Sequence, residues 1–281
     1  MTQLRNAQSP HRAPGSCRQD SDAKTHNILG IYFSLVSYRD VMTELVRWRE
    51  RKEWHYVTLT PPYSVLMCRD DLRLMEATQG ATLTLPDGVG IILAAKLLRY
   101  RHSGRVSGPT LMLRLCDWGR EKKLRHFFYG GAPGVAEALT QRLSSRYPGL
   151  DVAGVHCPPF RDLTPQEDAE IVEKIHAARP DVVWVGLGSP KQEKWMAEHL
   201  GRIDAAALIG VGAAFDFHSG RVKWAPKWMR ALGIEWAYRL VTEPRRMWRR
   251  NVNSFVFLAR VLQQCMVSIA GKREHVPSES K

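Results

Sequence analysis

The sequence predicts an α/β fold: a parallel sheet with helices on both faces, followed by a helical C-terminal appendage. Between about residues 28 and 220, short apolar runs alternate with amphipathic stretches of helix length, which is the pattern of a parallel sheet covered on both sides. After Gly220 the composition changes, and tryptophans are interleaved with arginines. We therefore expect a disordered tail over residues 1–27, an α/β domain over 28–220 and a basic amphipathic appendage over 221–281.

The individual elements of the α/β domain follow from these runs. Five apolar runs predict buried strands, at residues 57–60, 82–85, 126–129, 182–185 and 207–211. Five amphipathic stretches predict helices, at residues 64–79, 89–99, 133–147, 165–179 and 190–200. Two of these helices have strong N-terminal signals, because Thr164–Glu167 and Ser189–Gln192 each match a capping box with proline at the first helical position.

The charge of the chain is unevenly distributed. The 281 residues carry a net charge of +13, which requires an anionic partner such as nucleic acid, a phosphorylated substrate or an anionic membrane. Residues 221–281 contain 13 Lys/Arg against four Asp/Glu, so most of the excess lies in the appendage. The same segment carries an apolar stripe at three- and four-residue spacing, formed by Phe255, Leu258, Leu262, Met266 and Ile269.

Cysteine usage and hydropathy indicate a reduced protein that does not span a membrane. The five cysteines are dispersed, without a C-x-x-C pair or zinc spacing, and predict reduced thiols that act as packing residues. Residues 1–27 are polar and do not resemble a signal peptide. The most apolar segment, residues 255–270, is interrupted by Arg260, Gln263 and Gln264, so no spanning helix is predicted.

Three segments lie where predicted strands end, the edge at which open parallel sheets bind ligands. Gly186–Glu193 combines glycines with a helix N-terminus and suits a pyrophosphate, although Gln192 could simply complete a capping box. Tyr129–Gly134 is either a second wall of a nucleotide pocket or a tight turn. In Leu85–Gly90, Asp87 is either a helix N-cap or a general base.

The sequence predicts no metal site. The only D-x-D triplet, Asp20–Asp22, lies in the predicted tail, where it would have no rigid support. The pair Asp70–Asp71 is interpreted as a helix surface pair, and the ten histidines lack metal-ligand spacing.

Seven segments, spread in order over residues 56–250, resemble the WecG/TagA/CpsF glycosyltransferases, glycosyltransferase family 26. They are Leu85–Gly90, Arg105–Gly108, Tyr129–Gly134, Gly186–Glu193, Gly210–Phe217, Ala225–Pro226 and Glu235–Arg246. The resemblance implies a Rossmann-like parallel sheet with helices on both faces, and an inverting glycosyltransferase that needs no metal ion or other cofactor. It would move a hexose or N-acetylhexosamine-type sugar from a UDP-sugar to a polyprenyl-pyrophosphate-linked saccharide, in the biosynthesis of a cell-surface polysaccharide such as an exopolysaccharide.

The resemblance also implies roles for individual residues. Asp87 would be the general base. The acceptor side would include Thr58, Thr60 and Arg105. The donor side would include Gly130, Gly131, Gly188, Gln192, Asp216, Arg239, Arg245 and Arg246. Residues 28–220 would then be the catalytic domain, and residues 221–281 would hold the enzyme peripherally on the anionic, cytoplasmic face of the cell membrane.

The sequence departs from the family at two places and leaves two other functions open. Thr60 replaces the usual asparagine of a T-x-N segment, and Thr110 replaces the usual aspartate of G-x-D-L, so the acceptor is less defined than the reaction. Interleaved tryptophan and arginine are also typical of single-stranded nucleic-acid binders, although the family resemblance implies no nucleic-acid partner. An inactive member that scaffolds polysaccharide assembly is the other alternative, and a homo-oligomer is possible under each.

Overall fold

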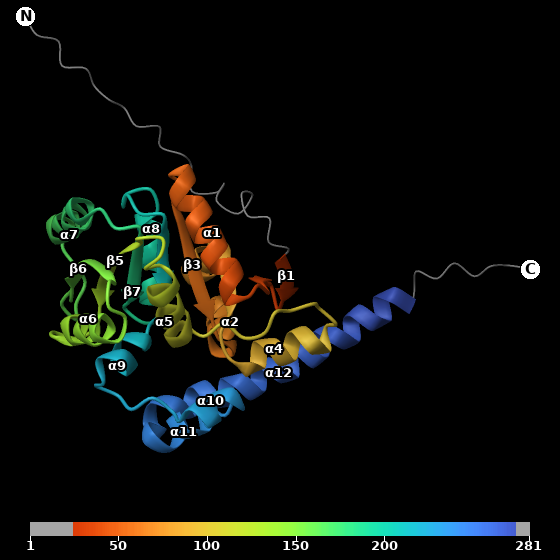
Figure 1. The fold of residues 1–281 in the computed structure, drawn as a ribbon. Coiled ribbons are helices and arrows are strands. Elements are labelled where there is room, and N and C mark those ends of the chain that lie inside the picture. The colour runs from red at the N-terminus through yellow and green to blue at the C-terminus, as the bar shows by residue number, and fades with distance from the viewer. Residues whose placement is uncertain (1–24, 274–281) are drawn as a thin grey trace, which may run out of the picture.

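The computed structural model describes residues 25–273, and its centre is a six-stranded sheet (Figure 1). The strand order is β4-β3-β8-β7-β5-β6, and every neighbouring pair is parallel. The strands are β3 (His55–Thr60), β4 (Leu83–Pro86), β5 (Arg125–Gly130), β6 (Asp151–His156), β7 (Val182–Gly186) and β8 (Ala207–Gly210). Because all six run in one direction, their carboxyl ends meet at one edge. The predicted α/β fold class is confirmed.

Helices cover both faces of this sheet because successive strand residues point to opposite sides. Trp184 packs in the core beneath α1 (Tyr38–Arg51), α5 (Gly108–Trp118) and α6 (Val135–Arg146). Its neighbours Val183 and Val185 pack in the core beneath α7 (Pro165–Ala178) and α8 (Lys191–His199). Strands buried on both faces account for the nearly continuous apolar runs in the sequence.

The predicted helix over residues 64–79 is two helices, α2 (Pro62–Asp70) and α3 (Leu72–Gln79). The break is at Asp71, whose carboxylate accepts a hydrogen bond from the backbone N–H of Leu74 at 3.0 Å and so caps α3. The Lys194 Nζ of α8 lies 2.6 Å from the same carboxylate. The interpretation of Asp70–Asp71 as a surface pair is therefore wrong for Asp71, which joins α3 to α8.

The first described residues form a hairpin, β1 (Thr25–Ile28) and β2 (Ile31–Ser34), beside the main sheet. Residues 25–27, which the sequence assigned to the tail, are therefore part of a strand, while residues 1–24 lie outside the described residues. The hairpin packs in a third core with α2, α3 and α4 (Val89–Leu97). This core is the one that receives the C-terminal helix.

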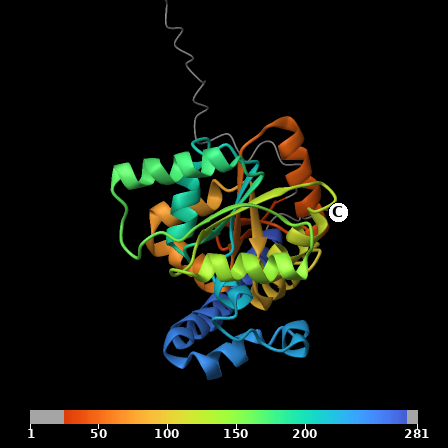
Figure 2. The same cartoon turned by 60° about the vertical axis from the view of Figure 1, so that its left-hand side comes forward.

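Helix α9 (Ala214–Ser219) packs on α5 and α6 and belongs to the α/β domain. The C-terminal segment consists of α10 (Lys227–Ala231), α11 (Glu235–Thr242) and the long α12 (Pro244–Arg273), which lie at one end of the body (Figures 1 and 2). Phe257 and Val261 of α12 are fully buried in the third core. Gln264 accepts a hydrogen bond from the backbone N–H of Leu29 at 3.0 Å. The helix is thus joined to the α/β domain over much of its length.

The apolar stripe predicted on α12 is not its buried face. Phe255, Leu262 and Met266 are at least half exposed, whereas Leu258 is partly buried. The side chain of Ile269 lies outside the described residues. Among residues 25–273, no helix has the length and apolar character needed to cross a bilayer.

The four cysteines within the described residues are free thiols, as predicted. Cys68 and Cys116 are fully buried, and burial raises the pKa of each thiol. Both act as packing residues in the cores described above.

Candidate active site

Asp87 lies at the carboxyl edge of the sheet, directly after β4. Its backbone N–H donates to the carbonyl of Thr60 at the end of β3, with an N–O distance of 3.4 Å, and the Val106 N–H donates to the carbonyl of Pro86 at 3.1 Å. The N-cap residue of α4 is Gly88, with φ +95°. The alternative interpretation of Asp87 as the N-cap is therefore wrong, and its carboxylate faces a cavity.

This cavity, of about 390 Å³, extends over the ends of four strands. Loops after β3, β4, β7 and β8 form its floor, and α11 and α12 form its roof. Its polar lining consists of Tyr63, Asp87, Arg105, Ser107, Ser189, Gln192, Glu193, Glu235, Arg239, Arg250, Asn251 and Ser254. A cavity of this size at the carboxyl edge of a parallel sheet is a typical small-molecule site.

The environment of Asp87 favours a proton acceptor that works near neutral pH. Although part of its surface faces the cavity, protein encloses the carboxyl on the other sides, and this burial raises its pKa to about 6. Arg105 lowers the pKa, Glu235 raises it, and Arg239 lowers it again. A carboxyl poised in this way is deprotonated at pH 7 and remains basic enough to accept a proton.

Three arginines approach the cavity from different elements. Arg105, before α5, donates from Nη2 to the carbonyl of Arg230 at 3.3 Å. Arg239 of α11 lies over the ring of Phe217, 5.4 Å from its centroid, and within the described residues its buried Nη2 lacks a hydrogen-bond partner. Arg250 of α12 lies over the Tyr63 ring at 4.6 Å. Such a set of guanidinium groups is suited to a phosphorylated ligand.

The first turn of α8 presents a buried amide to the cavity. The N-cap of α8 is Pro190, so the capping box predicted at Ser189–Gln192 is absent. Instead the Gln192 side chain, which is buried, donates from Nε2 to Glu193 Oε1 at 3.1 Å. Glycine at position 210 makes room for this amide, because a Cβ there would lie 3.1 Å from Gln192 Nε2.

Within the described residues, the oxygen of the Gln192 amide is buried without a hydrogen-bond partner. A buried acceptor in this condition is costly unless a ligand donates to it. Glu193 is also buried, and burial raises the pKa of its carboxyl. Gln192 and Glu193 therefore form a polar part of the cavity wall whose side chains are held in place by their mutual hydrogen bond.

The predicted glycines lie at the edge of the sheet between β5 and β7. Gly130 has φ +130°, and a Cβ on it would lie 2.6 Å from the carbonyl carbon of Gly186, so only glycine fits. The Gly131 N–H donates to the carbonyl of Gly186 at 3.2 Å. The connections after β5 and β7 leave in opposite directions across the sheet, which makes this a topological switch point. Gly188 borders the cavity, whereas Gly130 and Gly131 are not part of its lining.

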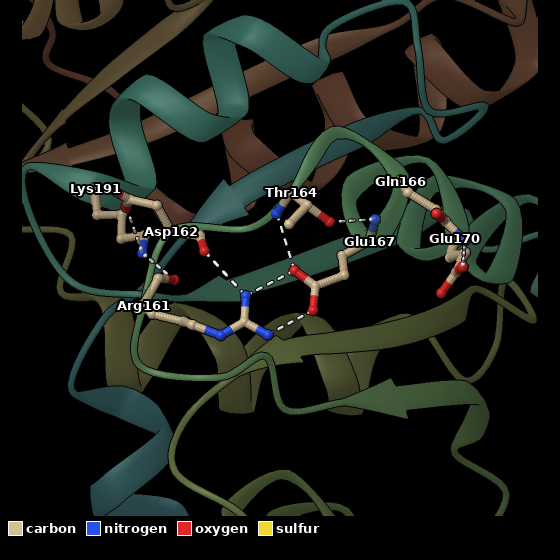
Figure 3. A network of polar contacts seen from close by, with 7 residues as sticks. All are labelled: Arg161, Asp162, Thr164, Gln166, Glu167, Glu170 and Lys191. Carbon is tan, nitrogen blue, oxygen red and sulfur yellow. Dashed lines mark hydrogen bonds and ion pairs between the residues drawn. The ribbon is translucent and has the colours of Figure 1, made fainter.

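A polar network attaches the loop after β6 to the start of α8 (Figure 3). The predicted capping box at Thr164 is confirmed, with Glu167 N donating to Thr164 Oγ1 at 3.2 Å. Glu167 also pairs with Arg161, at 2.7 Å between Nη1 and Oε2. Lys191 Nζ donates to the carbonyl of Arg161 at 3.2 Å and lies 3.5 Å from Asp162. The loop is therefore held beside the first turn of α8.

The structure brings together some of the predicted site residues but not all of them. Asp87, Arg105, Gly188, Gln192 and Arg239 line one cavity. Six other predicted residues are not part of its lining: Thr58 and Thr60 are buried in β3, Gly130 and Gly131 lie at the end of β5, Asp216 is half-buried in α9, and Arg245 is exposed. The side chain of Arg246 lies outside the described residues. Thr60 nevertheless supports the site, through its carbonyl bond to the backbone of Asp87.

Most of the other lining residues were not predicted as site residues, among them Tyr63, Glu193, Trp236 and Arg250. The signal for Glu193 was its place directly after Gln192 in the same segment. The sequence signal for Arg250 was weak, because it is one of four arginines within six residues. Which of them faces the cavity depends on how α12 is oriented about its own axis. Among residues 25–273, no group of three His, Cys, Asp or Glu residues has metal-site geometry; Asp20 and Asp22 lie outside the described residues.

Comparison with known proteins identifies the family. The sequence model described as "Glycosyl transferase WecG/TagA/CpsF family" matches residues 26–270. A relative in Bacillus subtilis (strain 168), named N-acetylglucosaminyldiphosphoundecaprenol N-acetyl-beta-D-mannosaminyltransferase, is 30% identical over 239 residues, 85% of this chain and 90% of the relative.

Two further relatives carry the same name. The protein of Bacillus spizizenii (strain ATCC 23059 / NRRL B-14472 / W23) is 36% identical over 191 residues, 68% of this chain and 72% of the relative. The protein of Staphylococcus aureus (strain NCTC 8325 / PS 47) is 31% identical over 184 residues, 65% of this chain and 70% of the relative. With the family match extending over nearly the whole described fold, this chain belongs to the WecG/TagA/CpsF family of glycosyl transferases.

Proposed function

We propose that this glycosyltransferase moves a hexose or N-acetylhexosamine-type sugar from a UDP-sugar to a saccharide linked to a polyprenyl diphosphate, with inversion at the anomeric carbon. The observation that carries the proposal is the position of Asp87, a carboxylate at the carboxyl edge of the sheet that faces a cavity with Arg105 and Arg239. The relatives, named for transfer of N-acetylmannosamine to N-acetylglucosaminyldiphosphoundecaprenol, support the acceptor class.

The chemistry follows from one base and one displacement. Asp87 accepts the proton of the acceptor hydroxyl as its oxygen forms a bond to the anomeric carbon. The bond from that carbon to the donor diphosphate breaks, and the electron pair leaves with the nucleoside diphosphate. Single displacement inverts the anomeric configuration. The arginines of the cavity stabilise the charge that develops on the leaving group.

The substrate pair is tested by a donor screen with the purified chain and short-prenyl diphosphate acceptors that carry N-acetylglucosamine. We expect turnover with one UDP-sugar of the hexose or N-acetylhexosamine class, and a product of inverted configuration by NMR. A retained configuration would contradict the single displacement. Absence of turnover with every donor would favour the interpretation of the chain as an inactive scaffold.

We expect catalysis to be independent of divalent metal ions. The D-x-D triplet Asp20–Asp22 precedes the first strand, and the arginines of the cavity can neutralise the diphosphate in place of a metal ion. Turnover in EDTA should stay within about twofold of the untreated rate, far from the loss expected when a Lewis acid is removed. A chain that begins at Lys24, which keeps β1 whole, should behave in the same way. Loss of activity in EDTA that Mg²⁺ or Mn²⁺ restores would overturn this expectation.

We also propose that the C-terminal segment holds the enzyme on an anionic membrane surface. The exposed surface of this segment carries apolar side chains, including Trp228, Trp248, Leu262 and Met266, and arginines, including Arg245 and Arg249. Attraction of basic residues to an anionic leaflet contributes about 1 kcal/mol per residue and is screened by salt. Burial of apolar area resists salt.

Vesicle sedimentation separates these two contributions. Binding to phosphatidylserine vesicles should fall as salt rises and leave a salt-resistant fraction. Changing Arg245 and Arg249 to Gln should flatten the salt dependence, and changing Leu262 and Met266 to Ser should remove the resistant fraction. Point variants are preferable to truncation of α12, because Phe257 and Val261 belong to the third core. An intact protein that ignores anionic vesicles at low salt contradicts the proposal.

A further inference from the structure

The cavity above Asp87 has two chemically different ends. Its polar end contains the carboxylate, the Gln192 amide and the arginines described above. Its other end is apolar and is formed by Val89, Leu93, Trp236, Phe255 and Leu258, from α4, α11 and α12. Aromatic rings such as Trp236 and Phe255 also stack on nucleobases and sugar faces. Val89, Leu93 and Leu258 add an aliphatic surface that sugars, nucleotides and diphosphates do not require.

The apolar end is formed where α4 and α12 lie side by side (Figure 1). Their inner faces close on each other, with Ile91 and Ala94 of α4 packed in one core with Phe257 and Val261 of α12. Their outer faces remain uncovered. On α4, Val89 and Leu93 are 43% and 42% exposed and lie one turn apart on the same side. On α12, Phe255 is 68% exposed.

The apolar surface continues past the cavity along both helices. Leu97 follows Leu93 by four residues on α4, and Leu262 follows Leu258 by four residues on α12, so both rows continue along the same helix faces. The turn between α10 and α11 rests on the start of α4, because a Cβ on Gly233 would lie 2.3 Å from Val89 Cγ2. The apolar end is therefore roofed near Asp87 and uncovered farther along α4.

Along α12 the lining changes from charged to apolar in one direction. The change runs from Arg250 to Leu258: Arg250, Asn251 and Ser254 are polar, and Phe255 and Leu258 follow, whereas the buried Met247 precedes this run and adds one apolar contact at its start. With a rise of 1.5 Å per residue, the positions from Arg250 to Leu258 extend over about 12 Å of helix. A polyprenyl diphosphate has the same order of groups, an anionic diphosphate followed by a branched hydrocarbon.

We infer that the apolar end of the cavity, between α4 and α12, binds the isoprenoid units of the acceptor lipid that lie next to its diphosphate. The inference rests on the proposed function and adds a binding site for the lipid tail. It differs from attachment to a membrane surface, because the groove contacts the tail of the acceptor molecule that reacts. Acceptor recognition would then include the first part of the hydrocarbon as well as the sugar and the phosphates.

The test measures kcat/KM of the full chain with acceptors that share one sugar diphosphate and differ in their tails: methyl, isopentenyl, geranyl and farnesyl. All are used as monomers in solution, without vesicles or detergent, so membrane binding cannot contribute. We expect kcat/KM of the wild type to rise at least about tenfold from methyl to geranyl, the consequence of burying apolar carbons in a protein groove. Most of the change should appear in KM.

Two variants on different helices test the walls, Leu93→Ser on α4 and Phe255→Ser on α12. Both side chains are substantially exposed, so either variant keeps the cores intact. Each should reduce the gain from methyl to geranyl to less than about threefold. Because the gain is a ratio within one variant, changes in steps shared by all acceptors cancel. The control is Leu72→Ser on α3, 76% exposed and outside the cavity, which should keep the full gain.

The experiment distinguishes failure of the groove inference from failure of the proposed function. An active wild type with equal kcat/KM for all tails overturns the inference and leaves the proposed function intact. Variants of Leu93 and Phe255 that keep the full gain overturn it as well, as does an equal loss of gain in the Leu72 control. An enzyme that is inactive with every prenyl diphosphate acceptor overturns the proposed function, and the groove assignment falls with it.

Discussion

Replacement of Asp87 by asparagine should lower kcat by about 10²–10⁴-fold, the usual contribution of a general base. Asparagine keeps the size of the side chain and its ability to accept the Gly88 N–H, but it cannot take a proton from the acceptor hydroxyl. Donor binding should change little, which UDP titration can measure. A variant that retains a third or more of the wild-type kcat would remove Asp87 from the reaction.

The pH dependence of the wild type provides an independent measurement. Because burial raises the pKa of Asp87 to about 6, the base is increasingly protonated as pH falls through that value. We expect kcat/KM to be constant above pH 7 and to fall about tenfold per pH unit well below 6. A profile that is flat down to pH 5 would show that a different group accepts the proton.

Stability should change in the opposite direction to activity. The folded state of Asp87 holds its proton more tightly than the unfolded chain does, since its pKa is raised from 3.8 to about 6. This group therefore favours unfolding increasingly as pH rises from about 4 to 6, and the cost remains at higher pH. Asp87→Asn removes that cost, so its Tm at pH 7.5 should equal or exceed that of the wild type. The exposed Asp151→Asn serves as the control, with both kcat and Tm close to those of the wild type.

The sheet could be predicted from the sequence because its strands are buried on both faces. Runs such as residues 182–185 are continuously apolar, which is typical of parallel strands that are covered by helices on both faces. Strand β6 was missed because it is half-buried, contains Gly154 and has only β5 as a neighbour. The same reasoning explains why Asp87 could be placed correctly: a polar residue directly after a buried strand must lie at the carboxyl edge of the sheet.

The C-terminal helix shows what sequence periodicity leaves undetermined. Helix α12 is apolar on more than one face, with Phe257 and Val261 inside and Phe255 and Leu262 outside. Spacing identifies both sets as helical stripes, but the packing of α12 against α2 and α4 determines which stripe is covered. The orientation of α12 about its own axis likewise places Arg250 in the cavity lining and leaves Arg245 exposed.

The second large effect is expected at Arg239, the arginine of α11 that lines the cavity. Replacing Arg239 by alanine should lower kcat/KM by about 10²–10³-fold with a soluble acceptor and no membrane, as expected for loss of a charged group that stabilises a leaving diphosphate. Arg239 is half-buried on the cavity wall, and its charge also lowers the pKa of Asp87. The loss for Arg250→Ala should be of similar kind, since Arg250 also lines the cavity.

Arg245→Ala is the informative comparison, because the sequence placed Arg245 on the donor side whereas the structure leaves it exposed outside the cavity lining. We expect its loss in kcat/KM to be at least about tenfold smaller than that of Arg239→Ala. Arg73→Ala, an exposed position on α3, controls for the change in net charge. Arg239→Lys keeps the charge but not the planar fork, and it should recover only part of the activity.

Binding measurements separate the two ways in which Arg239 could act. If Arg239 holds the diphosphate in the ground state and the transition state equally, its loss raises KM and the Kd for UDP but leaves kcat unchanged. If it meets charge that develops as the glycosidic bond breaks, kcat falls as well. We expect the second result. The Arg239 Nε lies 3.8 Å from Glu243 Oε1, which orients the guanidinium. Within the described residues its buried Nη2 is without a hydrogen-bond partner, so this nitrogen is preorganised for an incoming anion. Equal losses for Arg239→Ala and Arg245→Ala would show instead that the C-terminal segment moves when substrate binds.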